Sequence, residues 1–505
     1  MREKYESLAL ANLKELAKAR GIKGTSGMKK AQVVEAMLLQ DEKDKAAGGG
    51  TDHVQTEAAP ARQAADVKEA ARFKETESSK EEAHTKEPAH FKETAHPREA
   101  APSKETVPRE EVRRTEERSE APNSDKFPAE LDSGITANGI LEVMPDGYGF
   151  IRCENYLPGE NDVYVAPSQI RRFNLKTGDI IEGNTRIKTQ SEKFSALLYL
   201  KKINGYTPEM AARRCNFEDM TPIFPDERLH LERQGSSVAM RIMDLISPVG
   251  KGQRGMIVSP PKAGKTTLLK EVAKSIKNIP NMHLIILLID ERPEEVTDIK
   301  EAIEGPNVEV IYSTFDELPE HHKRVSEMVI ERAKRLVEHK RDVTILLDSI
   351  TRLTRAYNLT VPPSGRTLSG GLDPAALHMP KRFFGAARNM RGGGSLTILA
   401  TALVETGSKM DDVVYEEFKG TGNMEMVLDR KLSEKRVFPA IDIPKSSTRR
   451  EDLLLTREEM EAINIIRKAL NGLKPEEAVD KVLDMFTRTK NNNEFVQMVK
   501  KMRFI

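Results

Sequence analysis

The chain has 505 residues, of which 31% are charged and 38% hydrophobic, and its formal net charge at pH 7 is +1. This length predicts about three to four units of ordinary domain size, and the balanced charge gives no overall signal for nucleic acid. The two cysteines, Cys153 and Cys215, form no CxxC pattern, which argues against a disulfide framework or a zinc site. No apolar run has membrane-spanning length, so we expect a cytoplasmic protein without a membrane partner.

Residues 1–45 carry apolar side chains at helical spacing, with a glycine-containing break at 21–27. This periodicity predicts short helices that bury one face against each other. We therefore expect a small N-terminal helical module with apolar positions at Leu10, Leu13, Leu16, Ala17, Val33, Val34, Met37 and Leu38.

The next segment, 46–134, has no Leu, Ile, Met, Tyr or Trp before residue 131. It contains a hexapeptide repeat in which a basic residue precedes Glu, at Lys74, Lys80, Lys86, Lys92, Arg98 and Lys104. A β-solenoid can have such a period, but it needs an aliphatic core residue in every repeat. Because none is present, we predict a disordered linker of mixed charge.

Short alternating strands separated by Gly, Asn and Asp turns follow over 135–207, which predicts a cold-shock-like OB-fold barrel. Tyr148 and Phe150 alternate along one of these strands, so their rings share a face, and Arg152 stands beside them. Exposed rings on such a barrel stack on bases, each worth about 1–3 kcal/mol. Tyr164 and Phe194 would extend this surface. The alternative, packing in the core, is the commoner role of aromatic residues in strands.

After a connector at 208–233, aliphatic strands alternate with amphipathic helices over 234–505, as in a parallel α/β sheet. The expected strands are Gly255–Val258, Leu284–Ile289, Val308–Tyr312, Val343–Leu347 and Leu396–Thr401. The predicted fold class is therefore multidomain, with a helical module, an OB-fold barrel and a RecA-like P-loop ATPase domain.

A phosphate-binding loop is predicted at Ser259–Thr266, which reads SPPKAGKT between a strand and a helix. Backbone amides at the helix start would hold the phosphates. Lys265 would contact the β and γ oxygens, and Thr266 would hold Mg²⁺. Ser259 stands where the strict pattern has glycine. A second glycine-rich stretch is also assigned to ATP, with a plain turn as the alternative; it comprises Gly250, Lys251, Gly252, Gln253, Arg254 and Gly255.

Three further residue types complete the predicted catalytic site. Asp348 ends an aliphatic strand, as a Walker B carboxylate does, and would hold Mg²⁺ through water. Glu291, at the end of another strand, is the candidate base for the attacking water. Arg436 and Arg449 in the arginine-rich tail could neutralise transition-state charge. From chemistry alone, surface salt bridges are favoured for these arginines, and a solvated strand end is the alternative for each carboxylate.

Together these motifs resemble a known family. GYGF, DVYV, PPKAGKT, LLIDERPEEVT, LLDSITRL, RAYN, PKRFFGAARN, TGSKMDDVVYEEFKGTGN and EKRVFPAID occur in this order. From about Ile135 to its end, the chain resembles the Rho family of bacterial transcription termination factors. The resemblance implies a homohexamer that binds nascent single-stranded RNA, preferably pyrimidine-rich, and moves 5′ to 3′ using ATP. It also implies that RNA polymerase and elongation factors are partners.

The resemblance also assigns individual residues. The primary RNA site would comprise Gly147, Tyr148, Gly149, Phe150, Ile151, Arg152, Asp162, Val163, Tyr164, Glu192, Lys193 and Phe194. Two loops in the ring's pore, Pro363–Gly371 with Gly370 and Gly371 and Glu405–Lys409 with Lys409, would form a secondary RNA site. The ATP site would add Lys262, Ala263, Gly264, Thr267, Arg292 and Phe438, with the adenine between Phe438 and Thr267. Arg449 and Arg436 would act in the neighbouring subunit's site.

Two other functions are compatible with parts of the sequence. A rotary ATP-synthase-type subunit would share the α/β core, but the base-stacking barrel and Lys409 argue against it. An RNA-binding scaffold gated by nucleotide would need no water-activating carboxylate, so Glu291 argues against that reading.

Overall fold

The computed structural model describes residues 17, 28–47, 131–190, 192–470, 473 and 475–501. The chain divides into two units, Met1–Val112 and Arg113–Ile505, which we describe separately. In the first unit, α3 (Lys30–Ala47) packs Val33 and Val34 with Ala17 in a small buried cluster. The predicted break at 21–27 and the repeats of the predicted linker lie outside the described residues.

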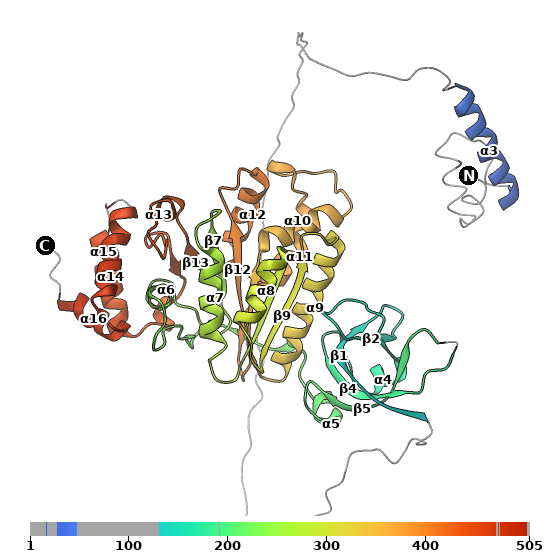
Figure 1. Cartoon of the computed structure of the whole chain (residues 1–505), viewed down its shortest axis with the longest axis horizontal. Helices are drawn as coiled ribbons and strands as arrows, with labels where there is room; N and C mark the ends of the chain where they lie inside the picture. Colours follow the sequence, from blue (N-terminus) through green and yellow to red (C-terminus); the bar gives the residue numbers. More distant parts are fainter. Residues whose placement is uncertain are drawn as a thin grey trace, which may run out of the picture. The chain divides into compact units, whose positions relative to one another are not determined.

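The second unit begins with a closed barrel whose strands are ordered β1-β2-β3-β5-β4 (Figure 1). Its elements are β1 (Asp132–Val143), β2 (Gly149–Arg152), β3 (Val163–Val165), α4 (Pro167–Arg172), β4 (Ile180–Arg186) and β5 (Ser195–Ile203). The barrel core contains Leu141, Ile151, Val163 and Val165. The predicted OB-like barrel is confirmed, although β1 starts three residues before the expected boundary at 135.

The segment after the barrel belongs partly to the next domain. It contains α5 (Pro208–Ala212), the 3₁₀ helix η4 (Phe217–Asp219) and β6 (Pro222–Ile223). β6 pairs with β11 of the α/β sheet, and Leu229 and Leu231 are buried in the core of the α/β domain. The expected boundary at 233 is therefore too late, because these residues already pack against the α/β sheet.

The α/β domain is built on a sheet ordered β14-β13-β7-β12-β10-β8-β9, with helices packed around it (Figure 1). The strands from β13 to β9 in this order run parallel. The strands are β7 (Arg254–Ser259), β8 (Met282–Glu291), β9 (Val308–Thr314), β10 (Asp342–Asp348), β11 (Arg388–Met390), β12 (Ser395–Leu403), β13 (Met424–Val427) and β14 (Ser447–Thr448). The predicted parallel α/β domain is confirmed, with all five expected strands present.

Helices connect these strands and extend the domain at its C-terminal end. They are α6 (Val238–Ile246), α7 (Lys265–Ile276), α8 (Pro293–Ala302), α9 (Pro319–Glu338), α10 (Ile350–Thr360), η5 (Ser369–Gly371), η6 (Pro374–Leu377), α11 (His378–Gly385), α12 (Lys409–Lys419), α13 (Arg430–Glu434), η7 (Glu451–Leu453), α14 (Arg457–Leu470), α15 (Pro475–Thr487) and α16 (Asn492–Lys501). Among the described helices, none has both the length and the apolar character needed to cross a membrane.

Candidate nucleotide site and nucleic-acid interface

The phosphate-binding loop lies at the carboxyl end of β7, between Ser259 and the start of α7 at Lys265. Gly264 immediately precedes the helix with a φ of 88°, in the left-handed region that glycine adopts readily. The unpaired backbone amides of the first turn of α7 therefore face this loop, and a helix N-terminus of this kind favours binding of an anion. This geometry is that of a nucleotide phosphate cradle.

Lys265 lies between two carboxylates at the carboxyl ends of neighbouring strands. Its Nζ is 2.9 Å from Glu291 Oε1 and 2.6 Å from Asp348 Oδ1. Both carboxylates are almost fully buried, at 3% and 1% exposure. Burial alone would lower the pKa of Lys265, but Asp348 and Glu291 raise it above its ordinary value. The lysine is therefore held as a cation where the phosphates of a nucleotide would lie.

Two further polar residues near Lys265, Arg352 and Thr401, were not predicted from the sequence. Arg352 on α10 approaches Glu291 Oε2 with Nη1 at 3.4 Å, and Thr401 donates to Asp348 Oδ1 at 2.7 Å. Arg352 lies in the first turn of α10, shortly after Asp348 at the end of β10, and this spacing alone does not indicate a role in the site. The predicted Arg292 is exposed and lines a cavity of about 400 Å³ with Arg352 and Asp290.

A second cavity adjoins the phosphate-binding loop and is mostly apolar. It measures about 540 Å³ and contains the predicted residues Lys262, Ala263, Gly264, Thr267 and Phe438 in its lining. The Phe438 ring is 51% exposed, although large apolar side chains are normally buried. An exposed ring beside a phosphate cradle fits stacking on a flat base, as predicted for the adenine.

Replacing Phe438 with Ala is expected to weaken ATP binding about tenfold, because one stacked base is worth about 1–3 kcal/mol. A fluorescent ATP analogue titrated against the variant would measure this loss. Met210→Ala removes a similarly exposed large apolar side chain on α5, outside both cavities, and serves as the control. Equal affinity of Phe438→Ala and the unaltered chain would remove Phe438 from the adenine site.

The predicted glycine-rich stretch lies apart from the phosphate-binding loop of its own chain; it comprises Gly250, Lys251, Gly252, Gln253, Arg254 and Gly255. It lies at the amino end of β7, whereas the phosphate-binding loop follows the carboxyl end. Lys251 pairs with Asp342, the first residue of β10, and the Gly252 amide donates to Thr397 near the start of β12. These residues therefore do not join Lys265 in the ATP site of the same chain.

Arg449 lies at the same edge of the sheet as that stretch. Its backbone amide donates to Asn423, just before β13, and its side chain is exposed. Asn423 also accepts from the Arg254 amide through its Oδ1 at 2.8 Å, which places the Arg449 backbone close to the amino end of β7. Within the described residues, Arg449 forms no salt bridge, and it lies away from the P-loop of its own chain. Arg436 is exposed in the loop between α13 and Phe438.

The predicted aromatic residues form one cluster on the outside of the barrel. The ring of Phe150 lies 5.8 Å from Tyr148, 6.0 Å from Tyr164 and 5.1 Å from Phe194, measured between ring centroids. All four side chains are partly exposed, whereas Ile151 and Val163 point into the core. The core-packing alternative is therefore not supported for the aromatic residues. It does apply to Ile151 and Val163, whose side chains cannot contact RNA on this surface.

Arg152 and Asp162 lie directly beside the ring cluster. Arg152 is 6% exposed, donates from Nε to Glu142 Oε2 at 2.7 Å, and forms a salt bridge to Asp162 Oδ2. Its guanidinium lies 4.9 Å from the centre of the Phe150 ring. Both Glu142 and Asp162 therefore pair with the Arg152 guanidinium within the chain. Asp162 Oδ1 is buried without a hydrogen-bond partner among the described residues.

The remaining predicted RNA residues lie at the edge of the cluster and on the ATPase domain. Lys193 Nζ is 5.2 Å from the Phe194 ring. Glu192 pairs with Arg186, and a hydrogen bond from the Thr189 amide is the main cause of its lowered pKa. Gly147 and Gly149 flank Tyr148, and Gly147 has a φ of 86° that suits the turn before β2.

The two predicted pore loops contact each other. A Cβ on Gly370 would lie 2.4 Å from the backbone nitrogen of Met410, so only glycine allows this close approach. Gly370, Gly371 and Lys409 are all exposed. Asp411, just after Lys409, pairs with Arg355 on α10. The loops thus present glycine backbone and a lysine together at one surface.

Comparison with known proteins gives two domain matches. Residues 137–209 match the Rho termination factor, RNA-binding domain, and residues 239–448 match the ATP synthase alpha/beta family, nucleotide-binding domain. The chain is 55% identical over 376 residues to transcription termination factor Rho of Bacillus subtilis, covering 74% of this chain and 87% of the relative. It is 56% identical over 382 residues to the Pseudomonas aeruginosa factor, with 74% and 90% covered. It is 55% identical over 393 residues to the Aquifex aeolicus factor, and this match covers 76% of this chain and 90% of the relative.

Proposed function

This chain belongs to the Rho family of transcription termination factors, and we propose that it acts as a homohexameric translocase and helicase on nascent RNA. As a member of that family it is an ATP-dependent, RNA-binding termination factor with an ATPase domain. In the proposed reaction it moves 5′ to 3′ and releases the transcript from RNA polymerase, with elongation factors as further partners. The observation that carries the proposal is the presence in one chain of the exposed ring cluster and of Lys265 held between Glu291 and Asp348.

The catalytic roles follow from the positions of these side chains. With ATP bound, Lys265 would leave its carboxylates for the β and γ phosphate oxygens. Glu291, freed from the lysine, would polarise the attacking water and accept its proton. Arg352 would keep the Glu291 carboxylate oriented, since it already contacts Oε2.

Mg²⁺ fits this site because the ion needs only one or two protein ligands beside the phosphates. Thr266 supplies a hydroxyl and Asp348 a carboxylate, and the hydrogen bonds of Asp348 to Lys265 and Thr401 both end on Oδ1. Asp348 would hold the hydrated ion through its carboxylate, and Thr266 through its hydroxyl. When bound, that ion would neutralise charge on the phosphates.

The RNA site is proposed to prefer cytosine over uracil. Asp162 Oδ1 is a buried acceptor without a partner in the described structure, and the Asp162 carboxylate pairs with Arg152, which lies against the Phe150 ring. Cytosine offers an exocyclic amine donor at the position where uracil offers a carbonyl acceptor. If a base reaches this carboxylate, its unpartnered oxygen would accept a hydrogen bond from cytosine and not from uracil.

Arg449 is proposed to complete the ATP site of the neighbouring subunit. It is exposed, lies at the edge of the sheet opposite its own phosphate-binding loop, and forms no salt bridge within the described residues. A guanidinium in this place can neutralise transition-state charge only on a nucleotide held by another chain. The exposed Arg436 is a second candidate.

Mixing two inactive variants tests this trans arrangement. Arg449→Ala subunits keep Lys265, and Lys265→Ala subunits keep Arg449, so some interfaces in a mixed ring have both residues. We expect the mixture to hydrolyse ATP although neither variant does so alone. Native mass spectrometry would verify that the rings are mixed. Mixed rings without recovered hydrolysis would contradict a role for Arg449 in trans.

The alternatives fail on different observations. A rotary ATP-synthase-type subunit has no need of exposed rings on a barrel or of Lys409 on a pore loop, and a scaffold has no need of Glu291 beside Lys265.

The direct test uses RNA polymerase halted on a template with a labelled, cytosine-rich transcript. The proposed function predicts release of the transcript when this protein and ATP are both added. Release without ATP, or no release at all, would overturn it.

A further inference from the structure

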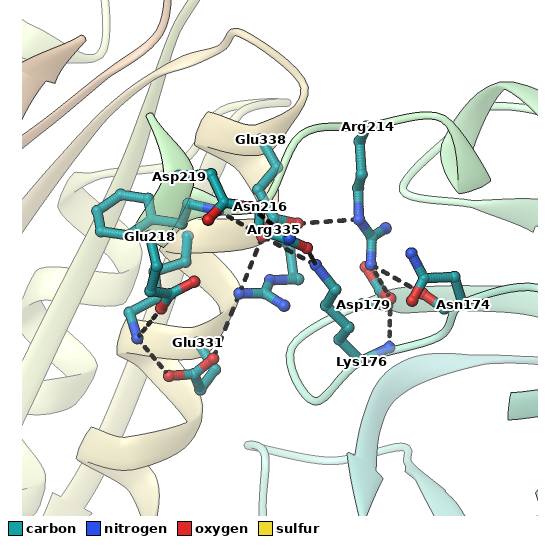
Figure 2. A network of polar contacts seen from close by, with 12 residues as sticks. Asn174, Lys176, Asp179, Arg214, Asn216, Glu218, Asp219, Glu331, Arg335 and Glu338 are labelled. Atoms are coloured by element: carbon teal, nitrogen blue, oxygen red, sulfur yellow. Dashed lines mark hydrogen bonds and ion pairs between the residues drawn. The ribbon is translucent and has the colours of Figure 1, made fainter. Parts of the chain in front are cut away.

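One face of α9 in the ATPase domain holds the barrel through buried charged residues. Figure 2 shows this network, in which Arg214 joins Asp179 of the barrel to Glu338 of α9. The two distances are 2.7 and 2.9 Å, and both carboxylate side chains are fully buried. A Cβ on Gly178 would lie 2.4 Å from the backbone of Glu331, so the barrel loop packs directly on the helix. Buried ion pairs and close backbone packing therefore hold the barrel against α9.

Arg324 lies on the same face of α9, about two helical turns before Glu331. Its Nη2 is 2.7 Å from both carboxylate oxygens of Glu142, a residue of β1. Glu142 also accepts from Arg152 Nε at 2.7 Å, and Arg152 in turn pairs with Asp162. A continuous series of charge-assisted hydrogen bonds thus runs from the ATPase domain to the proposed RNA site on the barrel.

This series of hydrogen bonds ends at Arg152 and Asp162, the groups that would contact a base. Arg152 lies over the Phe150 ring at 4.9 Å, and Asp162 keeps one buried oxygen without a partner in the described structure. A guanidinium forms hydrogen bonds in a rigid planar fork, so the position of Glu142 dictates the orientation of Arg152. Arg152 and the Gly159 amide, which donates to Asp162 Oδ2 at 3.0 Å, together set where the Asp162 carboxylate points.

We propose that Arg324 is a positioning residue for the RNA site, acting through Glu142 to hold Arg152 and Asp162 in the geometry that selects cytosine. The inference rests on the proposed function of the barrel as an RNA site. It assigns part of the base preference to a residue of the ATPase domain that touches no base. Arg324 itself is 34% exposed and Glu142 16%, so the contact is neither fully buried nor fully screened.

The test measures binding of fluorescent oligocytidine and oligouridine to the full-length chain at one fixed salt concentration. Arg324→Ala should weaken oligocytidine binding about fivefold, the effect expected for a partly exposed ion pair. Oligouridine binding should change much less, because uracil offers no amine to Asp162. Arg324→Lys keeps the charge within reach of Glu142 and should restore most of the cytosine preference.

Lys323→Ala is the matched control, because it removes the same charge one residue away. Lys323 lies over the Tyr357 ring of α10 and makes no contact with the barrel among the described residues. A second check is Glu142→Gln, which weakens the contacts with both Arg324 and Arg152, so adding Arg324→Ala to that variant should cause little further loss. Equal losses on both oligonucleotides, or the same loss in Lys323→Ala, would overturn the positioning role.

The outcomes also separate this inference from the function on which it rests. Tyr148→Ala with Phe150→Ala is run in the same assay. If that variant binds oligocytidine normally, the barrel surface is not the RNA site and the proposed function fails there. If it loses binding while Arg324→Ala keeps the full cytosine preference, only the role of Arg324 is wrong.

Discussion

Replacing Glu291 with Gln is expected to lower the ATP turnover rate by about 10² to 10⁴-fold, the usual contribution of a positioned general base. Glutamine keeps the shape of the side chain but cannot accept a proton. Because ATP binding depends on the phosphate-binding loop and the Phe438 cavity, nucleotide affinity should persist in the variant. Steady-state phosphate release and equilibrium binding of an ATP analogue, measured in parallel, would separate the two effects.

The control for this variant lies close by. Glu294 is an exposed carboxylate in the first turn of α8, so Glu294→Gln should leave turnover unchanged. Glu291 differs because it is 3% exposed and contacts both Lys265 and Arg352. Undiminished hydrolysis by Glu291→Gln would exclude Glu291 as the base and would restore the nucleotide-gated scaffold as a serious alternative.

Removing two rings of the barrel surface should have the largest effect on RNA capture. The double variant Tyr148→Ala with Phe150→Ala is expected to weaken binding of single-stranded RNA at least thirtyfold, since each stacked base contributes about 1–3 kcal/mol. The barrel should stay folded, because neither ring belongs to its core. RNA titration at fixed salt measures the loss, and circular dichroism verifies the fold.

The matched control is Phe224→Ala, which removes an exposed ring from the connector after the barrel. It should bind RNA as the unaltered chain does. If the double variant and the control bind equally well, the ring cluster is a surface feature without a role in RNA capture. The match of residues 137–209 to an RNA-binding domain would then have to be explained by another face of the barrel.

The sequence pattern predicted the parts of the fold that depend on local order. Aliphatic strands such as Val343–Leu347 and the Gly-Lys-Thr of the phosphate-binding loop carry their signal within a few residues. The alternation of Tyr148 and Phe150 likewise placed both rings on one face, because side chains alternate along a strand. Each of these features needs only its own neighbours in the chain.

Features that depend on distant pairing could not be predicted in this way. The stretch Gly250 to Gly255 and the phosphate-binding loop are close in the sequence, and only the strand between them, β7, shows that they lie at its opposite ends. The two-residue strand β6 is too short to carry a pattern, so its pairing with β11 was hidden. The contact of Arg324 with Glu142 joins two domains across a long stretch of chain, and no local spacing encodes it.

The central claim is that RNA on this protein drives hydrolysis at the Lys265 site. The most direct measurement is the steady-state rate of ATP hydrolysis with and without cytosine-rich single-stranded RNA, at saturating ATP and Mg²⁺. We predict a rate that is low without RNA and rises many-fold when the RNA is added, with a smaller rise for uridine-rich RNA. A rate that is the same with and without RNA would contradict the account.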